Sequence, residues 1–205
     1  MKAWFNAFVI TLVVLGGPVA ARAEKLVNVT FGGLVGLAYA PDQKGFSASG
    51  GNISDSFHIV PELFLGLDFR TPASGVGCDL FGGVISHGGF TGSFAGAEVS
   101  YILPHADKAK FLQRLKVGAF WANLDWADSG VDNVTFKDTT GFQGGYAFDV
   151  GRTVAFHGEI LYRQMAFDLE PGATFPSADK LDLSGVVVNF GVRFNFPVGS
   201  EPSGK

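Results

Sequence analysis

The sequence has little of several features that mark other classes of protein. Its one cysteine, Cys78, excludes a disulfide framework within the chain. After residue 23 no run reaches the ~18 apolar residues that a membrane-spanning helix needs, so a membrane-embedded fold would have to be a β-barrel. Basic residues are outnumbered, with 15 Lys and Arg against 19 Asp and Glu, and this balance does not favour a nucleic-acid partner.

Glycine and phenylalanine are abundant instead, at 29 and 21 residues, and they recur along short segments of alternating polarity. The segment from Leu183 to Phe196 shows this alternation most clearly. From Val186 on, every second residue is large and apolar, and the residues between include Gly191 and Arg193. A period of two is that of a β-strand. An unbroken, aromatic-rich apolar row opposite a polar row predicts one face in lipid and the other in a polar barrel lumen.

The N-terminal residues 1–23 have the three parts of a secretory signal peptide. Lys2 supplies a basic start, Phe8 to Leu15 is a short apolar run, and Ala21-Arg22-Ala23 has the small residues of a cleavage site. We expect this segment to be removed, which leaves a mature chain with a net charge of about −6. The barrel is then expected over residues 24–196, followed by a short polar periplasmic tail over 197–205.

Eight segments of alternating character can be counted in the chain. They cover residues 27–39, 57–70, 76–87, 90–103, 112–124, 141–150, 153–167 and 183–196. Most connections alternate between long polar loops, at 40–55, 125–140 and 168–180, and short turns; the link at 88–89 is short although it falls on the long-loop side. This asymmetry and the even strand count predict an all-β, eight-stranded antiparallel transmembrane up-and-down β-barrel with its long loops outside the cell. Pro61 removes one ladder donor and predicts a local irregularity.

Three stretches carry a resemblance to a known family. Ala155–Arg163 (AFHGEILYR), Asn189–Phe196 (NFGVRFNF) and Gly144–Asp149 (GGYAFD) resemble strands of the eight-stranded OmpA-like and opacity-type barrels, the broad porin family of small outer-membrane proteins. The resemblance implies a structural or cell-surface barrel. From the residues we expect no catalysis and no cofactor. The resemblance also implies outer-membrane lipids and lipopolysaccharide as surroundings, and insertion by the barrel-assembly machinery, which reads the last strand. We expect a monomer.

The polar rows contain many charged residues, which would face the lumen. Because eight strands leave an interior just wide enough for side chains to fill it, these charges are expected to pair with one another. A narrow pore for small solutes is the alternative, and it would need a continuous water column. The residues concerned are Glu62, Asp68, Arg70, Glu98, Arg114, Lys116, Asp149, Glu159, Arg163 and Arg193.

His58 and His87 are expected near the outer rim on neighbouring strands, with Asp55, Ser56 and Ser86 close to them in sequence. A hydroxyl, an imidazole and a carboxylate are the parts of a nucleophilic hydrolase, so a lipid A-modifying deacylase or acyltransferase is an alternative function. Proximity in sequence does not make a triad, however, and solvated or loop-bonded rim histidines are the plainer interpretation. We therefore assign no catalytic residue.

The remaining candidates have structural explanations. His157 and Glu159 share the lumen face, but no third ligand is evident, so core pairing is expected and no metal site is assigned. Cys78 is expected to fill space on the lipid-facing row. A soluble secreted barrel, with its apolar row inside, remains a further alternative. Several aromatic residues are expected to lie at the two membrane interfaces, among Tyr39, Tyr101, Trp121, Trp126, Tyr146 and Tyr162.

Overall fold

A computed structural model describes most of the chain after its N-terminal segment. The described residues are 26–44, 46–48, 51–53, 55–71, 74–87, 90–104, 110–126, 134–170 and 179–198. The predicted signal peptide, residues 1–23, lies outside them. Within these ranges no helix has both the length and the apolar character to cross a membrane.

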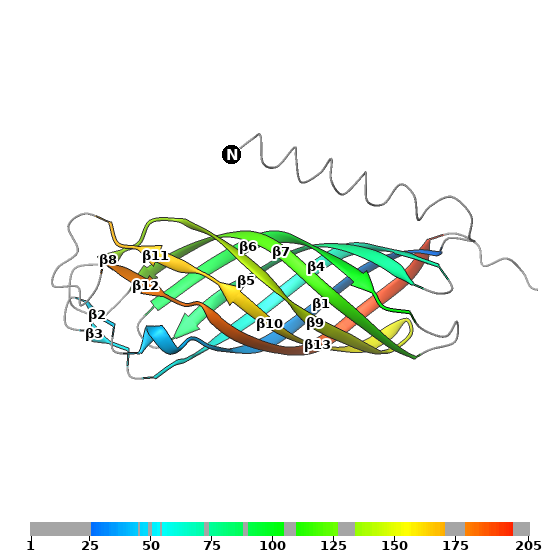
Figure 1. The fold of residues 1–205 in the computed structure, drawn as a ribbon, viewed down its shortest axis with the longest axis horizontal. Helices are drawn as coiled ribbons and strands as arrows, with labels where there is room; N and C mark the ends of the chain where they lie inside the picture. Colours follow the sequence, from blue (N-terminus) through cyan, green and yellow to red (C-terminus); the bar gives the residue numbers. More distant parts are fainter. Residues whose placement is uncertain are drawn as a thin grey trace, which may run out of the picture.

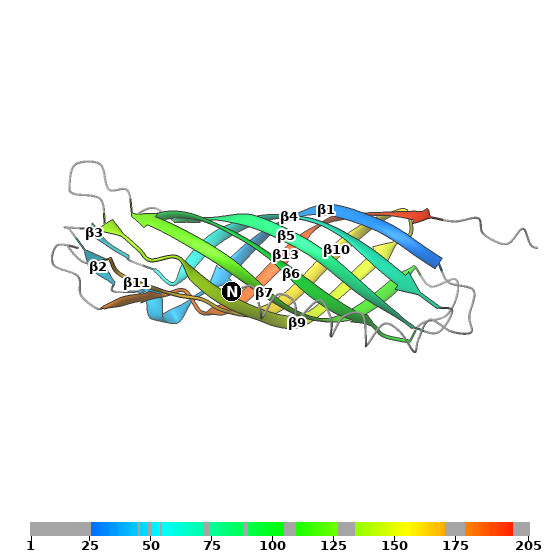
Figure 2. The ribbon, with the colours of Figure 1, turned by 90° about the horizontal axis from the view of Figure 1, so that it is seen from above.

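Eight long strands form a closed antiparallel barrel, in which each strand pairs with its neighbours in sequence order and the last pairs with the first (Figures 1 and 2). The strands are tilted against the long axis of the molecule, as closure of a small barrel requires. They are β1 (Leu26–Tyr39), β4 (Phe57–Arg70), β5 (Gly75–His87), β6 (Phe90–Ile102), β7 (Phe111–Trp126), β9 (Thr139–Gly151), β10 (Val154–Gln164) and β13 (Gly185–Val198). The predicted fold is confirmed.

The two faces of the wall follow the alternation in the sequence. In β4, Glu62 is 3% exposed while the next residue, Leu63, is 71% exposed. Large apolar side chains with exposed surface come from all eight barrel strands, whereas Glu62 and Arg163 are buried inside. Phe190, Leu65 and Tyr162 all face outward. The apolar rows therefore surround the barrel as a continuous outer belt, which excludes the inside-out arrangement of a soluble barrel.

Two local features follow from single residues. Val60 and Pro61 have no partners on β5, although Ile59 and Glu62 on either side of them keep the same register, because proline has no N–H to donate. The predicted irregularity is therefore a gap in the ladder. In the tight β9–β10 connection Gly151 has a φ of 139°, a conformation that side chains disfavour.

The long connections, which were predicted as polar loops, contain further ordered structure at one end of the barrel (Figure 1). A 3-10 turn, η1 (Pro41–Gln43), follows β1, and two short strands, β2 (Ser47–Ala48) and β3 (Gly51–Asn52), pair with each other. β8 (Val134–Thr135) pairs with the end of β7. β11 (Ala166–Asp168) and β12 (Lys180–Asp182) pair with each other and form a ribbon. An isolated bridge between Phe136, which follows β8, and Leu169, which follows β11, connects the two segments. These pieces extend the barrel wall beyond its rim.

Several predicted boundaries are therefore wrong. The predicted strand 153–167 breaks at Met165, whose backbone N–H donates to Oγ of Ser184, and its last residues belong to the β11–β12 ribbon. The predicted loops 125–140 and 168–180 include residues of β7, β9, β11 and β12, because pairing with β8 and within the ribbon prolongs the ladders. β13 continues to Val198, two residues into the predicted tail, because Pro197 and Val198 pair with β1.

Candidate functional site

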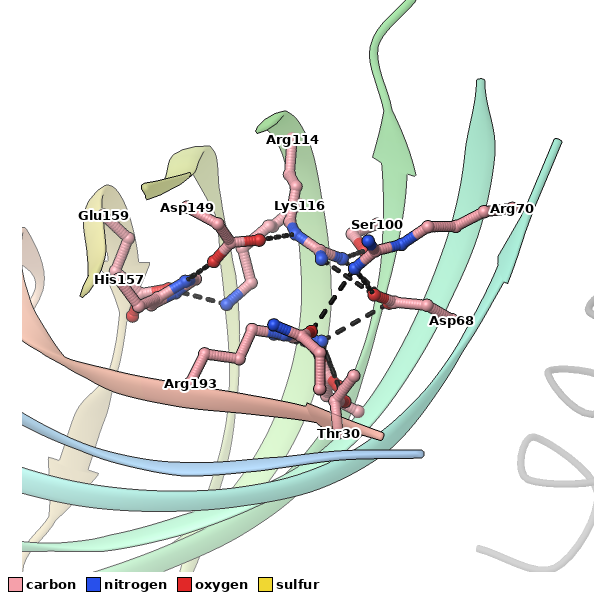
Figure 3. Close-up of polar contacts among 12 residues, drawn as sticks. Thr30, Asp68, Arg70, Ser100, Arg114, Lys116, Asp149, His157, Glu159 and Arg193 are labelled. Carbon is pink, nitrogen blue, oxygen red and sulfur yellow. Dashed lines mark hydrogen bonds and ion pairs between the residues drawn. The ribbon is translucent and has the colours of Figure 1, made fainter. Parts of the chain in front are cut away.

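The half of the interior near the short turns holds a connected network of charged side chains (Figure 3). Arg114 on β7 lies at its centre. Its Nη1 and Nη2 each donate to Asp68 on β4 at 2.8 Å, and its Nε donates to Oδ2 of Asp149 on β9 at 2.8 Å. Asp68 also accepts from Arg70 and, at 3.4 Å, from Arg193. Bidentate pairs of this kind fix the geometry of both partners.

A second part of the network runs from Asp149 toward the middle of the barrel. His157 lies 2.5 Å from Asp149 through Nδ1 and 3.4 Å from Glu159 through Nε2. The imidazole ring therefore bridges two carboxylates from neighbouring strands. The ammonium of Lys116 forms ion pairs with two carboxylates, Glu159 at 2.6 Å and Glu98 at 2.5 Å. The expected core pairing of His157 and Glu159 is therefore present, within a larger cluster.

Arg193 and Arg163 connect the remaining strands. Arg193 on β13 donates to Asp79 on β5 at 3.1 Å and to Thr30 on β1 at 2.9 Å. Arg163 on β10 pairs with Glu62 on β4 at 3.0 Å. Every barrel strand thus supplies a member of the network. Some pairs join neighbouring strands, as Arg114 and Asp149 do, and others cross the lumen between strands that are not neighbours, as Arg163 and Glu62 do. Among the described residues, Asp79 is the one buried lumen carboxylate outside the predicted charged row, because its segment alternates poorly.

Glycines on the inner face make room for these long side chains. A Cβ at Gly66 on β4 would overlap Oδ1 of Asp79, and one at Gly36 on β1 would overlap Oδ1 of Asn189. Because an interior of eight strands is narrow, a polar side chain can lie over its register partner on the adjacent strand only where that partner has no side chain. The abundance of glycine in the sequence therefore serves the packing of the lumen as well as the turns.

The half of the interior near the long loops is apolar, which the sequence analysis did not predict. Inward residues change character along a strand: in β7, Arg114 and Lys116 are followed by Phe120, Ala122 and Leu124. Side chains from the extended rim close this half from above. The buried cluster includes Leu34, Phe46, Ile53, Val60, Phe64, Phe81, Ile85, Phe90, Phe94, Phe120, Phe136, Met165, Phe167, Leu181 and Leu183. The inward positions near the loop ends of the strands are already apolar in the sequence, but the prediction treated the whole lumen as polar.

Arg163 lies at the junction of the two halves. Its guanidinium carbon is 4.5 Å from the centre of the Phe94 ring and 5.5 Å from that of Phe120, on the apolar side. On the charged side it donates to Glu62 and, through Nε at 2.9 Å, to Gln143. A guanidinium can satisfy both neighbours because its edge donates hydrogen bonds while its face packs on aromatic rings.

The rim histidines both pack against Phe90 but form hydrogen bonds with different partners. His87 Nε2 is 3.1 Å from Oδ1 of Asp55, and the His87 ring stacks on Phe90 with 5.2 Å between centres. His58 Nδ1 is 3.0 Å from Oε1 of Gln43. The hydrogen bond from the Phe57 N–H and the one from His87 hold the pKa of the Asp55 carboxyl below its usual range.

The structure does not assemble the catalytic triad that was considered. Ser86 is exposed on the outer face of β5, whereas the neighbouring His87 belongs to the inner row, because successive residues of a strand point to opposite faces. Among the described residues, neither His58 nor His87 has a hydrogen bond to a serine hydroxyl. The dyad of His87 and Asp55 therefore lacks a nucleophile in position.

Other candidates are placed as follows. No group of three His, Cys, Asp or Glu residues suited to a metal ion occurs in the part of the chain that the structure describes. Cys78 is half-buried on the outer row of β5, where it was expected. Tyr39, Tyr101, Trp121 and Tyr162 are exposed on the outer face, while Tyr146 is partly buried and donates to Gln113 at 2.8 Å. The side chain of Trp126 lies outside the described residues.

Comparisons with known proteins give no match to a family model and none to a curated protein sequence. Solved structures do match. Neisserial surface protein A has a TM-score of 0.50 at 12% identity, covering 83% of this chain and 97% of that one. The N-terminal β-barrel domain of Pseudomonas aeruginosa OprF has a TM-score of 0.49 at 13% identity, covering 85% and 98%. The outer membrane protein AlkL has a TM-score of 0.46 at 15% identity, covering 89% and 95%.

At this level of identity the similarity to Neisserial surface protein A concerns the fold alone. The fold is that of a small outer-membrane-type barrel: eight closed antiparallel strands, an apolar belt outside and a filled interior.

Proposed function

We propose that this protein is a β-barrel of a bacterial outer membrane with a structural or surface-interaction role and no catalytic activity. The belt of exposed apolar side chains from all eight strands carries this proposal, because a water-soluble protein rarely exposes an apolar surface that surrounds it. Lipids, including lipopolysaccharide, then surround the belt, and the barrel-assembly machinery inserts the chain through β13. The ordered rim of loops faces the outside of the cell, and the barrel is a monomer.

The filled interior supports a structural role rather than a pore function. Charged groups in one half are bonded to one another, and aromatic and aliphatic side chains fill the other half. Burial of four cationic side chains and six carboxylates in one cluster, with a fifth cation, Arg70, partly exposed beside them, is tolerable because each charge is compensated by a partner. The cationic residues are Arg70, Arg114, Lys116, Arg163 and Arg193, and the carboxylates are Glu62, Asp68, Asp79, Glu98, Asp149 and Glu159.

Cell fractionation tests the location. The protein is expected in the outer-membrane fraction of a sucrose gradient, and unboiled samples are expected to migrate differently from boiled ones on a denaturing gel, because a closed barrel resists detergent without heat. Recovery of the protein in the soluble periplasmic fraction without detergent would overturn the proposal.

Surface exposure of the loop side is tested by an inserted epitope. Lys137 and Asp138 are exposed in the connection between β8 and β9, so an epitope tag between them should not disturb the barrel. Intact cells are expected to bind an antibody to this tag. A tag between Arg152 and Thr153, in the opposite β9–β10 turn, is the matched control and should be stained only after permeabilisation. The reverse result would invert the proposed orientation.

The rim dyad gives a lipid A-modifying enzyme its one supporting observation. Mass spectrometry of lipid A from cells with and without the protein distinguishes the two functions. We expect identical acylation patterns. A change in acyl chains that His87→Ala abolishes, while the variant barrel still inserts, would replace the scaffold role with an enzymatic one.

A further inference from the structure

A hollow of about 440 Å³ opens on the outer surface of the barrel at the loop end of β1, β10 and β13. Its floor is Val186, which pairs with Tyr39 on one side and with Tyr162 on the other. Strands lie ~4.8 Å apart, so the two tyrosines stand on strands about 10 Å apart with the small valine between them. Both rings are exposed, Tyr39 at 44% and Tyr162 at 59%.

The two ends of the hollow differ in chemistry. Toward the middle of the barrel, the next outward row is apolar, because Leu37, Val188 and Ile160 are direct neighbours in the register. Toward the rim, the lining is polar and rich in acceptors, with carboxylates, an amide and a hydroxyl. These rim residues are Asp42, Gln164, Asp182 and Ser184.

The polar lining favours an uncharged headgroup with many hydroxyls. Ser184 is already bonded to the backbone of Met165, and the nearby ammonium of Lys180 is paired with Asp182 at 3.6 Å. Asp42 and the amide of Gln164 are exposed and remain as acceptors for hydroxyl protons. A phosphate would instead meet two carboxylates of its own sign, which disfavours it.

We propose that this hollow binds the headgroup of a sugar-bearing amphiphile from the surrounding lipid leaflet. A sugar ring fits between the rings of Tyr39 and Tyr162, whose flat faces pack against its C–H groups, while its hydroxyls donate to the rim acceptors. The attached acyl chain follows Val186 and Val188 down the apolar belt. This assignment rests on the proposed membrane location, and it adds a specific ligand class at a specific place.

The test uses the purified barrel in dodecylphosphocholine micelles, titrated with dodecyl maltoside and followed by NMR. We expect saturable shifts of the Ser184 and Gly185 amides, and nuclear Overhauser contacts between maltose protons and the rings of Tyr39 and Tyr162. Addition of more phosphocholine detergent of the same chain length should shift none of these signals, because choline lacks the hydroxyls that the rim acceptors bind.

Substitutions identify the groups responsible. Loss of one ring in Tyr162→Ala, or of one charge in Asp42→Asn, is expected to weaken the maltoside response about fivefold. Tyr101→Ala removes another exposed tyrosine, near the opposite end of the barrel, and should leave the response unchanged. The amide spectrum of each variant verifies that the barrel is intact.

Equal responses to the maltoside and the phosphocholine detergent would overturn the headgroup proposal, and so would a full response in Tyr162→Ala. Either result would leave the membrane location intact, because micelle incorporation and the gel shift report on that separately. A barrel that stays soluble without detergent would overturn the membrane location and, with it, the lipid ligand.

Discussion

At the residue scale, Asp68 is the side chain on which the charged network depends most. Three guanidinium groups donate to it, those of Arg70, Arg114 and Arg193, and Asp68 is fully buried. A buried charge that loses its partner is costly, since neither water nor another group compensates it. The network should therefore respond to the loss of one carboxylate charge more strongly than to any change at the surface.

We predict that Asp68→Asn lowers the free energy of unfolding by about 3–5 kcal/mol, because three cations then lose their shared anion. Urea unfolding of the barrel in phospholipid vesicles, followed by tryptophan fluorescence, measures this difference. Asp138→Asn, on the exposed rim, is the matched control and should change stability by less than about 0.5 kcal/mol. A comparable small effect for Asp68→Asn would mean that water reaches the network.

The sequence allowed prediction of which side chains face inward, but not of which ones meet. Alternation along β4 and β10 is enough to point Glu62 and Arg163 to the same interior. Their contact joins residues 101 positions apart and depends on strand tilt and register, which no local pattern specifies. For the same reason the junction of Arg163 with Phe94 was not predictable.

At the scale of single strands, β9 contains a natural comparison. Gly144 and Gly145 are adjacent, and a Cβ at Gly144 would approach one backbone oxygen, that of Lys116, at 3.3 Å. A Cβ at Gly145, on the inner face, would overlap the carbonyl oxygen of Ile160 in the neighbouring strand β10. A backbone atom held in a ladder cannot move aside as a flexible side chain can, so the two positions should tolerate a methyl group very differently.

Gly145→Ala is predicted to destabilise the barrel by about 1–3 kcal/mol, the usual cost of overpacking, and Gly144→Ala by well under that. Samples are heated to a series of temperatures before a denaturing gel, and the temperature at which the folded band disappears ranks the two variants. Equal thermal stability of the two would show that β9 and β10 can separate locally to admit the methyl group.

The loop-side rim was the part of the fold that sequence reasoning described least well. Phe136 lies inside the predicted loop 125–140, and Phe167 ends the predicted strand 153–167, so no alternating row predicts the β11–β12 ribbon. Their burial comes from contacts between connections distant in sequence, such as the edge-on packing of the two rings at 6.2 Å. The position of the rim therefore depends on tertiary contacts that become visible in the assembled barrel.

We predict that Phe167→Ala opens the β11–β12 ribbon without unfolding the barrel, because removal of a buried ring costs about 3–5 kcal/mol and the ladder of the ribbon has only three residue pairs. Hydrogen exchange should accelerate in residues 166–168 and 180–182, with protection of β4 and β13 unchanged. Phe142→Ala, which removes an exposed ring from the outer belt, is the control and should leave the ribbon protected.

At the scale of the whole molecule, the outer belt and the filled interior are complementary consequences of one alternation. Leu65, in the middle of β4, faces outward and is 55% exposed, so it would lie in the hydrocarbon of a bilayer.

Leu65→Arg is predicted to destabilise the inserted barrel by about 2–4 kcal/mol, the cost of an arginine near the midplane. Refolding titrations into vesicles measure it. Thr91→Arg, near the rim, should cost about 1 kcal/mol or less, and equal costs would contradict the proposed span.

The division of the interior into a charged half and an apolar half determines whether the barrel conducts. A water column would have to cross both the ion-paired layer around Arg114 and the aromatic layer around Phe120, and both side chains are buried. We therefore expect no stepwise currents from the wild-type protein in planar bilayers. The double variant Glu62→Ala and Arg163→Ala removes the pair at the junction without leaving either charge unpaired, and the space left there should admit water and give small, brief currents. Regular single-channel steps from the wild type would instead establish a pore, and would require the loop-side aromatic cluster to rearrange.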